Sequence, residues 1–250
     1  MLKNEREQEI IDLLKKSNGF VSVKSLCEKL YTSESSIRRD LTSLSQKGIL
    51  RRTHGGAELI NNFSNISSFG IRSHYNAEAK KVIAKKASSL IKDGNTIFLD
   101  QSSTAFFLAS ELINNSTITI VTNNIEIISL VSHTKLNLIS SGGNLSHENR
   151  MSLIGPDAQY IFENVYADFV FFATKSLTKD GTIWDFSRDE VIVRNSMMKN
   201  AKKKVFLCDS EKFYTQSAYK QCTLYDIDYL VCENEKAKEF SHISKNLIIL

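Results

Sequence analysis

The sequence predicts an α/β protein in two parts, a small N-terminal part dominated by helices and a larger C-terminal domain with a mostly parallel sheet. Apolar residues recur every three or four positions in the N-terminal part, which is typical of helices with one buried face. From residue 96 onward, short apolar runs alternate with segments of helical periodicity. Because strands of a parallel sheet covered on both faces are apolar throughout, this alternation indicates such a sheet.

The composition is that of a protein with a substantial core. The chain has 250 residues, of which 42% are hydrophobic, enough for a small module and one larger domain. The net charge is only +4, which excludes a histone-like polycation and fits poorly with a nonspecific nucleoid protein. The first 60 residues carry 11 basic and 8 acidic residues, so most of the positive excess lies at this end.

Cysteine spacing and hydropathy favour a cytoplasmic protein. Cys27, Cys208, Cys222 and Cys232 form no C-x-x-C pair and no set with zinc-like spacing, so neither a metal site nor a disulfide framework is predicted. The N-terminus is too charged for a signal peptide, and no apolar run approaches the roughly 18 to 20 residues that a membrane span requires. We therefore expect reduced thiols and no membrane contact.

Three short helices are predicted in the N-terminal part, over residues 5–16, from Ser22 onward and over residues 33–46. The first ends at a polar turn that closes with Gly19. Ser22 is a suitable N-cap for the second helix. A turn as short as the one that follows, between two helices with apolar faces, is the helix-turn-helix arrangement.

The third predicted helix has one apolar and one polar side. Ile37, Leu41 and Leu44 fall at i, i+4 and i+7, so we expect them to be buried. A helix in the DNA major groove would place its polar side against bases and phosphates. The candidate DNA-binding residues of this helix are Ser35, Ser36, Arg38, Arg39 and Thr42.

A short β-hairpin, the wing, is predicted after the third helix. Residues 49–53 have the pattern of a strand, and Gly55-Gly56 permits a tight turn. Arg51, Arg52 and His54 are candidates for neutralising phosphates, a salt-dependent and largely sequence-independent contribution to binding. An isolated arginine pair is more often a solvated surface. Its place beside a recognition helix favours DNA binding here.

Two motifs of the N-terminal part follow each other at close spacing. They are Ser36-Ile37-Arg38-Arg39-Asp40-Leu41, with Leu44 and Gly48 after it, and Arg52-Thr53-His54-Gly55-Gly56-Ala57. Together they resemble the DNA-binding signature of the deoxyribose-operon repressor (DeoR) family, which pairs a winged helix-turn-helix with a sugar-phosphate-sensing domain. We expect Asp40 to form an ion pair within its domain, because a carboxylate near phosphates would repel them.

The chain is predicted to divide after the hairpin. Residues 61–68 are polar and lack periodicity, so we predict a linker over residues 61–75. The expected domains are a winged helix-turn-helix DNA-binding domain over residues 1–60 and an effector domain over residues 76–250. The second begins with a helix over residues 76–92, whose lysine-rich face is more often a solvated surface than a site.

Seven apolar runs of the second domain are predicted strands. They cover residues 96–99, 117–121, 136–139, 169–173, 205–208, 229–232 and 247–250. Helical periodicity covers residues 105–112, 125–131 and 191–202. Ligands of open α/β sheets bind beyond the carboxyl ends of the strands, so the residues after each run are candidates for a binding site.

Polar residues, glycines and charges follow several of these strands. The candidate effector-binding residues are Asp100, Ser102, Ser103, Thr104, Asn123, Gly142, Gly143, Lys175, Asp209 and Lys212. Those around residue 102 open a helix, whose N-terminus favours anions. Each feature alone is more often a cap, a turn or a solvated side chain. Their joint occurrence at strand ends favours a phosphorylated small molecule.

The resemblance to the DeoR family continues through the second domain. It rests on Phe69, Arg72, Lys80, Phe98-Leu99-Asp100, Val121-Thr122-Asn123, Gly142-Gly143, Asp209, Lys212-Phe213 and Asp226-Ile227-Asp228. It implies a sugar-phosphate effector domain similar in fold to ribose-5-phosphate isomerase. The family's first loop commonly has glycine where this chain has Ser102. A side chain at this position would leave less space for the phosphate to approach the backbone of the loop. It would therefore change the pose of the phosphate, but not its general location.

The resemblance implies a transcriptional regulator, most simply a repressor of a sugar-metabolism operon whose operator affinity changes when a phosphorylated sugar binds. We expect a homodimer or higher homo-oligomer on double-stranded operator DNA, because one winged helix buries little surface. No cofactor is predicted beyond this effector.

An alternative is a sugar-phosphate isomerase-like enzyme with an accessory DNA-binding module. Asp100, Asp209 or Glu190 could supply the carboxylate that proton transfer requires. However, the five histidines are scattered, and no paired-carboxylate or nucleophile–base spacing is evident. We therefore expect a regulator and not an enzyme.

Overall fold

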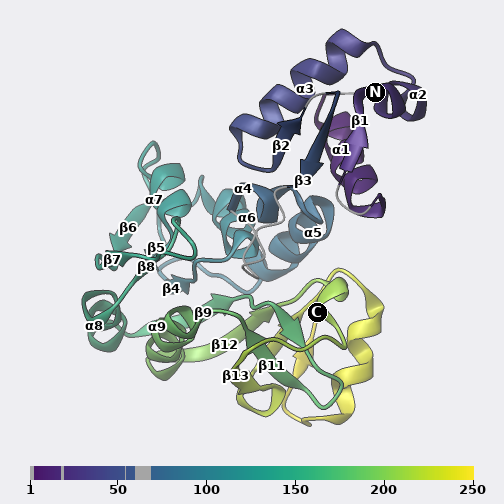
Figure 1. Cartoon of the computed structure of the whole chain (residues 1–250). Helices are drawn as coiled ribbons and strands as arrows, with labels where there is room; N and C mark the ends of the chain where they lie inside the picture. The colour runs from purple at the N-terminus through teal and green to yellow at the C-terminus, as the bar shows by residue number, and fades with distance from the viewer. Residues whose placement is uncertain (1–2, 18–19, 54, 60–68) are drawn as a thin grey trace. The chain divides into compact units, whose positions relative to one another are not determined.

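The computed structural model describes residues 3–17, 20–53, 55–59 and 69–250, and the chain forms two compact units. Unit 1 comprises Met1–Tyr75 and unit 2 comprises Asn76–Leu250 (Figure 1). Within the described ranges, no helix combines the length and apolar character needed to cross a membrane. All four cysteines are free.

Unit 1 contains the three predicted helices and the predicted hairpin. The helices are α1 (Lys3–Lys16), α2 (Val23–Leu30) and α3 (Glu34–Gln46), and the strands are β1 (Phe20–Ser22), β2 (Leu50–Thr53) and β3 (Gly56–Leu59). Strand β3 pairs antiparallel with both β1 and β2. The sequence analysis did not predict β1, because three residues directly before a helix are too few to show alternation. Helix α4 (Phe69–His74) lies in the interval predicted as a linker, whose residues 61–68 lie outside the described residues.

The core of unit 1 forms under α3. Ile37, Leu41 and Leu44 are all buried, as their spacing predicts. Asp40 is buried beside them, and Arg6 donates to it through Nη2 at 3.2 Å and through Nε. The expected ion pair of Asp40 within its own domain is therefore confirmed.

Unit 2 is built around a seven-stranded sheet in which every pair is parallel. The strands are β4 (Thr96–Leu99), β5 (Thr119–Thr122), β6 (Asn137–Ser140), β9 (Ala167–Phe172), β12 (Ala201–Leu207), β14 (Tyr229–Val231) and β15 (Ile248–Ile249). Their order is β15-β14-β12-β9-β4-β5-β6. The predicted parallel sheet is confirmed. The chain leaves β4 toward β6 and resumes at β9 on the other side of β4, so the order reverses between β4 and β9, where ligands commonly bind.

Helices cover both faces of this sheet (Figure 1). They are α5 (Ala77–Ser88), α6 (Ser103–Leu112), α7 (Ile125–Val131), α8 (Pro156–Asn164) and α9 (Arg188–Lys199), with short 3-10 helices η1 (Ser210–Lys212), η2 (Leu224–Asp226) and η3 (Glu235–His242). Helices α5, α6 and α7 contribute to one apolar cluster, and α8, α9 and η3 contribute to the other. Because both faces of the sheet are covered, β4, β5 and the last three residues of β9 and of β12 are almost entirely buried.

Two smaller sheets of unit 2 were not predicted from the sequence. One is the antiparallel set β10 (Ser176–Leu177), β11 (Thr182–Asp185) and β13 (Tyr219–Thr223), and the other is the hairpin of β7 (Asn144–Leu145) and β8 (Leu153–Ile154). These strands have only two residues or contain polar residues, as in β11 (TIWD) and β13 (YKQCT), so they lack the apolar runs that predicted the main sheet. The first set brings Asp185 and Gln221 to α9, with consequences for the site below.

Gly143 is required by the packing of β8 and α8. Its φ is +102°, and a Cβ there would lie 2.6 Å from the carbonyl oxygen of Ile154 and 3.0 Å from Cβ of Ala158. Gly142 has a φ of +66°, but a Cβ there would meet nothing within 4 Å. Packing within the protein alone therefore explains the glycine at position 143.

We expect Gly143→Ala to lower the free energy of unfolding of unit 2 by about 3 kcal/mol, because the cost of backbone strain is added to the cost of a steric overlap. Gly142→Ala, the matched control, should cost only about 1 kcal/mol from strain. Urea unfolding followed by fluorescence measures both, since the single tryptophan, Trp184, lies on β11 of unit 2. Equal losses in the two variants would contradict this account.

Candidate functional site

The outward side of α3 carries the polar residues that the sequence analysis selected. Ser35, Arg38 and Arg39 are exposed, and Ser36 and Thr42 are partly exposed. The Nε of Arg38 donates to Glu34 Oε1 at 2.7 Å, and the Nε of Arg39 donates to the carbonyl of Ser35 at 3.3 Å. Both guanidinium groups are thus held along the helix surface, with further N–H donors available for an external acceptor.

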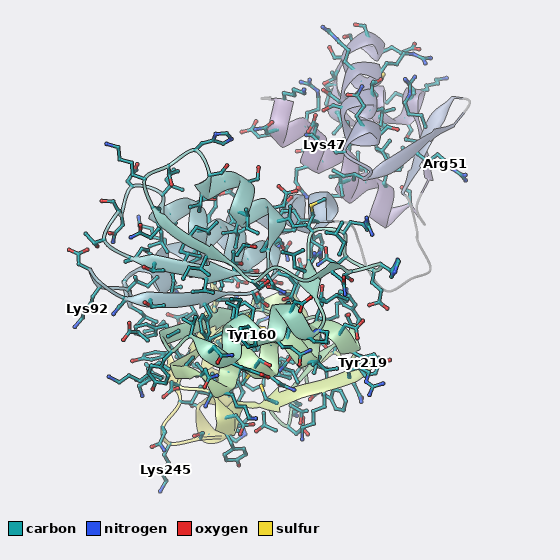
Figure 2. All side chains as sticks on the ribbon, turned by 90° about the vertical axis from the view of Figure 1, so that its left-hand side faces the viewer. Lys47, Arg51, Lys92, Tyr160, Tyr219 and Lys245 are labelled. Carbon is teal, nitrogen blue, oxygen red and sulfur yellow. The ribbon has the colours of Figure 1, made fainter. Side chains whose placement is uncertain are left out.

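The wing is joined to α3 by a side-chain contact. Arg51 and Arg52 are exposed on β2, and Nη1 of Arg52 donates to Oγ1 of Thr42 at 3.0 Å. Gly55 turns the hairpin with a φ of +84°, and its carbonyl accepts from the N–H of Val23 at 2.9 Å. Figure 2 shows the labelled Arg51 side chain on the hairpin. The candidate His54 lies outside the described residues.

This surface has the parts that a winged helix uses on DNA. Four arginines are presented by two adjoining elements, two by α3 and two by β2. A helix with exposed arginines can reach base edges in the major groove, while arginines of the hairpin neutralise phosphates. The buried side of α3 carries the apolar residues, so the helix can face DNA without exposing its core.

At the strand ends of unit 2, Asp100 accepts three hydrogen bonds from protein groups. One carboxylate oxygen accepts from the N–H of Ser102 at 3.0 Å. The other accepts from the N–H of Ala173 at 3.2 Å and from Nε of Arg194 at 3.1 Å. The residue is completely buried. Asp100 therefore fixes the loop after β4 against the end of β9.

Arg194 of α9 is the cation that balances Asp100. It is 1% exposed, forms an ion pair with Asp185 at 3.0 Å and donates to Gln221 Oε1 at 2.6 Å. Burial alone would lower the pKa of Arg194, but Asp185 and Asp100, with Glu190, outweigh it and raise the pKa. One guanidinium thus joins the loop after β4 to the small sheet of β11 and β13.

The loops after β4 and β5 are joined by amide side chains. The Nδ2 of Asn123 donates to Leu153 O at 2.9 Å and to Gln101 Oε1 at 3.3 Å. Asn124 caps α7 and donates to the carbonyls of Asp100 and Ser102, each at 3.3 Å. These bonds bring Asn123 together with the loop after β4, as expected for one binding site.

Several buried polar atoms near these strand ends have no hydrogen-bond partner among the described residues. They are Gln101 Nε2, Asn123 Oδ1, Ser152 Oγ, Thr174 Oγ1 and Ser176 Oγ. A buried donor or acceptor left unpaired costs roughly 1 to 3 kcal/mol. Such groups are normally paired with protein, water or ligand, so their concentration at the end of the sheet makes this region a candidate site for a polar ligand.

Ser102 is the N-cap of α6. Its Oγ accepts from the N–H of Ala105 at 3.1 Å, and its φ of −76° requires no glycine. Ser103 and Thr104 are buried in the first turn of α6. The side chain of Ser102 is therefore turned back onto the helix.

The charged pair after β12 is a separate part of the strand-end region. Lys212 Nζ lies 3.1 Å from Asp209 Oδ2, and Asn76 donates to the other oxygen at 3.3 Å. Burial alone would raise the pKa of Asp209, but Lys212 and the buried Lys80 outweigh it and lower the pKa. Two lysines therefore act on the carboxylate of Asp209.

Lys175 is exposed just beyond β9, and Gly142 is exposed beyond β6. Gln101 and Arg194 were not predicted from the sequence as site residues. Gln101 stands between two selected residues, so its position at the strand end could have revealed it. Arg194 lies in the middle of a helix, and no local pattern distinguishes it.

Both units match known family models. Residues 6–63 match the DeoR-like helix-turn-helix domain, and residues 75–234 match the DeoR C terminal sensor domain. The chain is 34% identical to the HTH-type transcriptional regulator GolR of Listeria innocua, over 94% of this chain and 92% of that protein. It is 31% identical to the lactose phosphotransferase system repressor of Staphylococcus aureus, over 97% of each. A ribose 5-phosphate isomerase A structure from Methanocaldococcus jannaschii aligns over 55% of each chain, with a TM-score of 0.42 and 20% identity.

Asp209 should make the stability of unit 2 depend on pH. A carboxyl whose pKa is lower in the folded state stabilises the fold above its unfolded pKa, about 3.9, and this contribution is lost as the pH falls through the folded pKa. We expect Asp209→Asn to be less stable than the parent at pH 7, with a difference that shrinks below about pH 4.

Urea unfolding by Trp184 fluorescence across this pH range measures the difference. Glu111→Gln, on the exposed side of α6, is the control and should change stability little. A difference between Asp209→Asn and the parent that stays constant with pH would contradict the assigned ion pair.

Proposed function

Since the chain belongs to the DeoR family of DNA-binding transcriptional regulators, we propose that it controls a sugar-metabolism operon in response to a phosphorylated sugar. Unit 1 binds double-stranded operator DNA through α3 and the wing. Unit 2 holds the effector at the carboxyl ends of its parallel strands. Repression relieved by the effector is the simplest form of this control. The protein acts in the cytoplasm, where the operator DNA and phosphorylated sugars are found.

The effector assignment depends mainly on the unpaired buried groups at the strand ends. Gln101 Nε2 is a donor without an acceptor, and Asn123 Oδ1 is an acceptor without a donor among the described residues. A sugar offers hydroxyls that both donate and accept, so one ligand can satisfy both groups. An apolar ligand would leave them unpaired and would bind with a penalty.

We assign the phosphate of the effector to the N-terminus of α6 and to Lys212, at the same strand ends. The N-terminus of α6 presents backbone N–H groups around Ser103 and Thr104, and helix N-termini favour anions. Lys212, which is 20% exposed and paired with Asp209, supplies a cation. Asp100 has a positioning role, because its oxygens are occupied by protein donors.

Regulation agrees better with this geometry than catalysis does. A general base needs a carboxylate that can take up a proton near the substrate. Asp100 is bound to Arg194, and Asp209 is bound to Lys212 and lies beside Lys80. Lys212 and Lys80 favour the ionised form of Asp209 and weaken it as a base. These ion pairs therefore support a role of the described strand ends in binding a ligand.

The effector must act by differential affinity. A ligand that binds equally to the DNA-binding and non-binding arrangements of the two units would change nothing. Reciprocity requires that operator DNA weaken effector binding by the same factor as the effector weakens DNA binding. We expect a homodimer or higher oligomer on the operator, because a single winged helix reads only one half-site.

Arg39→Ala should remove base discrimination. We expect the ratio of affinities for a selected operator duplex and a scrambled duplex to fall about 10- to 100-fold, since a good arginine–base contact contributes roughly 1 to 3 kcal/mol. Fluorescence anisotropy with both duplexes at one salt concentration measures the ratio. An unchanged ratio would remove Arg39 from the base-reading role.

Arg51→Ala is the matched control on the wing. It should weaken binding to both duplexes by the same factor and reduce the slope of log affinity against log salt by about one. A changed ratio in this variant would show that Arg51 also reads bases.

A thermal-shift screen tests the effector. Phosphorylated sugars are compared with the same sugars without phosphate and with inorganic phosphate. A true effector at a concentration 100 times its dissociation constant should stabilise the folded protein by about 2.7 kcal/mol. A shift that is equally large without the phosphate would contradict the proposal.

Gln101→Met should then weaken binding of the identified sugar phosphate about 10-fold, because one hydrogen bond to the ligand is lost. Operator affinity in the absence of the sugar should stay unchanged.

A further inference from the structure

Two buried hydroxyl groups lie close together in the chain just after β9. They belong to Thr174 and Ser176, and neither oxygen has a hydrogen-bond partner among the described residues. Thr174 is 6% exposed and Ser176 is 1% exposed. Lys175 between them is exposed, so this part of the chain borders the surface of unit 2. We call the three residues Thr174-Lys175-Ser176 the β9-end segment.

Buried hydroxyls elsewhere in unit 2 show the usual pairing. Thr122 Oγ1 donates to the carbonyl of Leu99 at 2.7 Å and accepts from the N–H of Asn124 at 3.1 Å. Ser146 Oγ accepts from the N–H of Asn149 at 3.1 Å. An unpaired buried hydroxyl destabilises the fold, and valine or alanine would avoid this cost. Residues that break such a rule are expected mainly at functional sites, so the two hydroxyls of the β9-end segment indicate a ligand contact.

One end of the segment lies beside the loop after β4. Strands β4 and β9 are neighbouring parallel strands. The N–H of Ala173, directly before the segment, donates to Asp100 Oδ2 at 3.2 Å. Gln101 follows Asp100, and its Nε2 is also unpaired among the described residues. Thr174 is therefore next to the loop that carries one of the groups assigned to the sugar.

The other end of the segment lies beside the chain at Lys212. Leu177 forms a parallel bridge with Phe213, and its carbonyl accepts from the N–H of Tyr214 at 2.7 Å. In a parallel pairing the preceding residues are also neighbours, which brings Ser176 close to Lys212. The β9-end segment thus connects the loop of Gln101 with the cation assigned to the phosphate.

We propose that Thr174 and Ser176 bind the effector directly, Thr174 at a hydroxyl of the sugar and Ser176 at an oxygen of the phosphate. A threonine hydroxyl both donates and accepts, as a sugar hydroxyl does, so the two can pair in either direction. Ser176 donates to the phosphate beside Lys212, and a hydrogen bond to a charged acceptor is stronger than one between neutral groups. This inference rests on the proposed function, because it places Thr174 and Ser176 in the same effector site.

Thr174→Val tests whether the hydroxyl is retained at the expense of stability. Without ligand, the melting temperature of unit 2 should rise by about 2 to 4 °C, because an unpaired buried hydroxyl is replaced by a methyl group. Thr122→Val is the matched control and should lower it by at least about 2 °C, because the hydroxyl of Thr122 is paired. Trp184 fluorescence of the full chain reports the unfolding of unit 2.

Isothermal titration calorimetry on the full chain tests the two contacts separately. The probes are ribose 5-phosphate, glucose 6-phosphate, fructose 6-phosphate and inorganic phosphate. Thr174→Val should weaken the binding of sugar phosphates about 10-fold and leave that of inorganic phosphate unchanged. Ser176→Ala should weaken the binding of sugar phosphates and of inorganic phosphate, each about 10-fold.

The outcomes separate this inference from the proposed function. If Thr174→Val and Ser176→Ala bind the sugar phosphates as tightly as the parent does, the inference is wrong and the proposed function stands. A Thr174→Val protein less stable than the parent would also overturn it. A parent that binds none of the sugar phosphates would count against both. Binding that depends on Thr174 but leaves operator affinity unchanged would support the inference and count against the proposed function.

Discussion

The architecture of unit 2 depends on the buried guanidinium of Arg194. It binds Asp100 from the main sheet, Asp185 and Gln221 from the small antiparallel sheet, and it is itself carried by α9. A buried ion pair is costly to assemble, and removing one partner leaves an uncompensated charge at a cost of roughly 3 to 5 kcal/mol. Elements far apart in the sequence are therefore fixed relative to one another by charge balance as well as by apolar packing.

This constraint also shapes the candidate binding region. Because Asp100 accepts from Ser102, Ala173 and Arg194, the loop after β4 is held in place with the N-terminus of α6 at its end. The neighbouring Gln101 and Asn123 keep unpaired atoms among the described residues. A rigid frame with incompletely paired groups is what a ligand site requires, since a ligand supplies the missing bonds without reorganising the protein.

The sequence predicted the features that are encoded locally and missed those that arise from long-range contacts. The buried side of α3 was predicted from the spacing of Ile37, Leu41 and Leu44, and the parallel sheet was predicted from the apolar runs. The strands β10, β11 and β13 form no extended apolar run, and so the partners of Arg194 could not be foreseen. The same limit applies to Gly143, selected as a ligand neighbour, because its packing against Ile154 and Ala158 depends on the unpredicted β8 and α8.

The incompletely paired strand ends also explain how a small ligand could supply enough free energy for regulation. Coupling between an effector and a second site is typically 1 to 3 kcal/mol. Satisfying one buried unpaired group recovers a free energy of about the same size. A sugar that pairs Gln101 or Asn123 in only one arrangement of the protein would therefore shift the equilibrium by the amount that regulation requires. Asp100 would contribute less in this way, because both of its oxygens already accept hydrogen bonds in the absence of ligand.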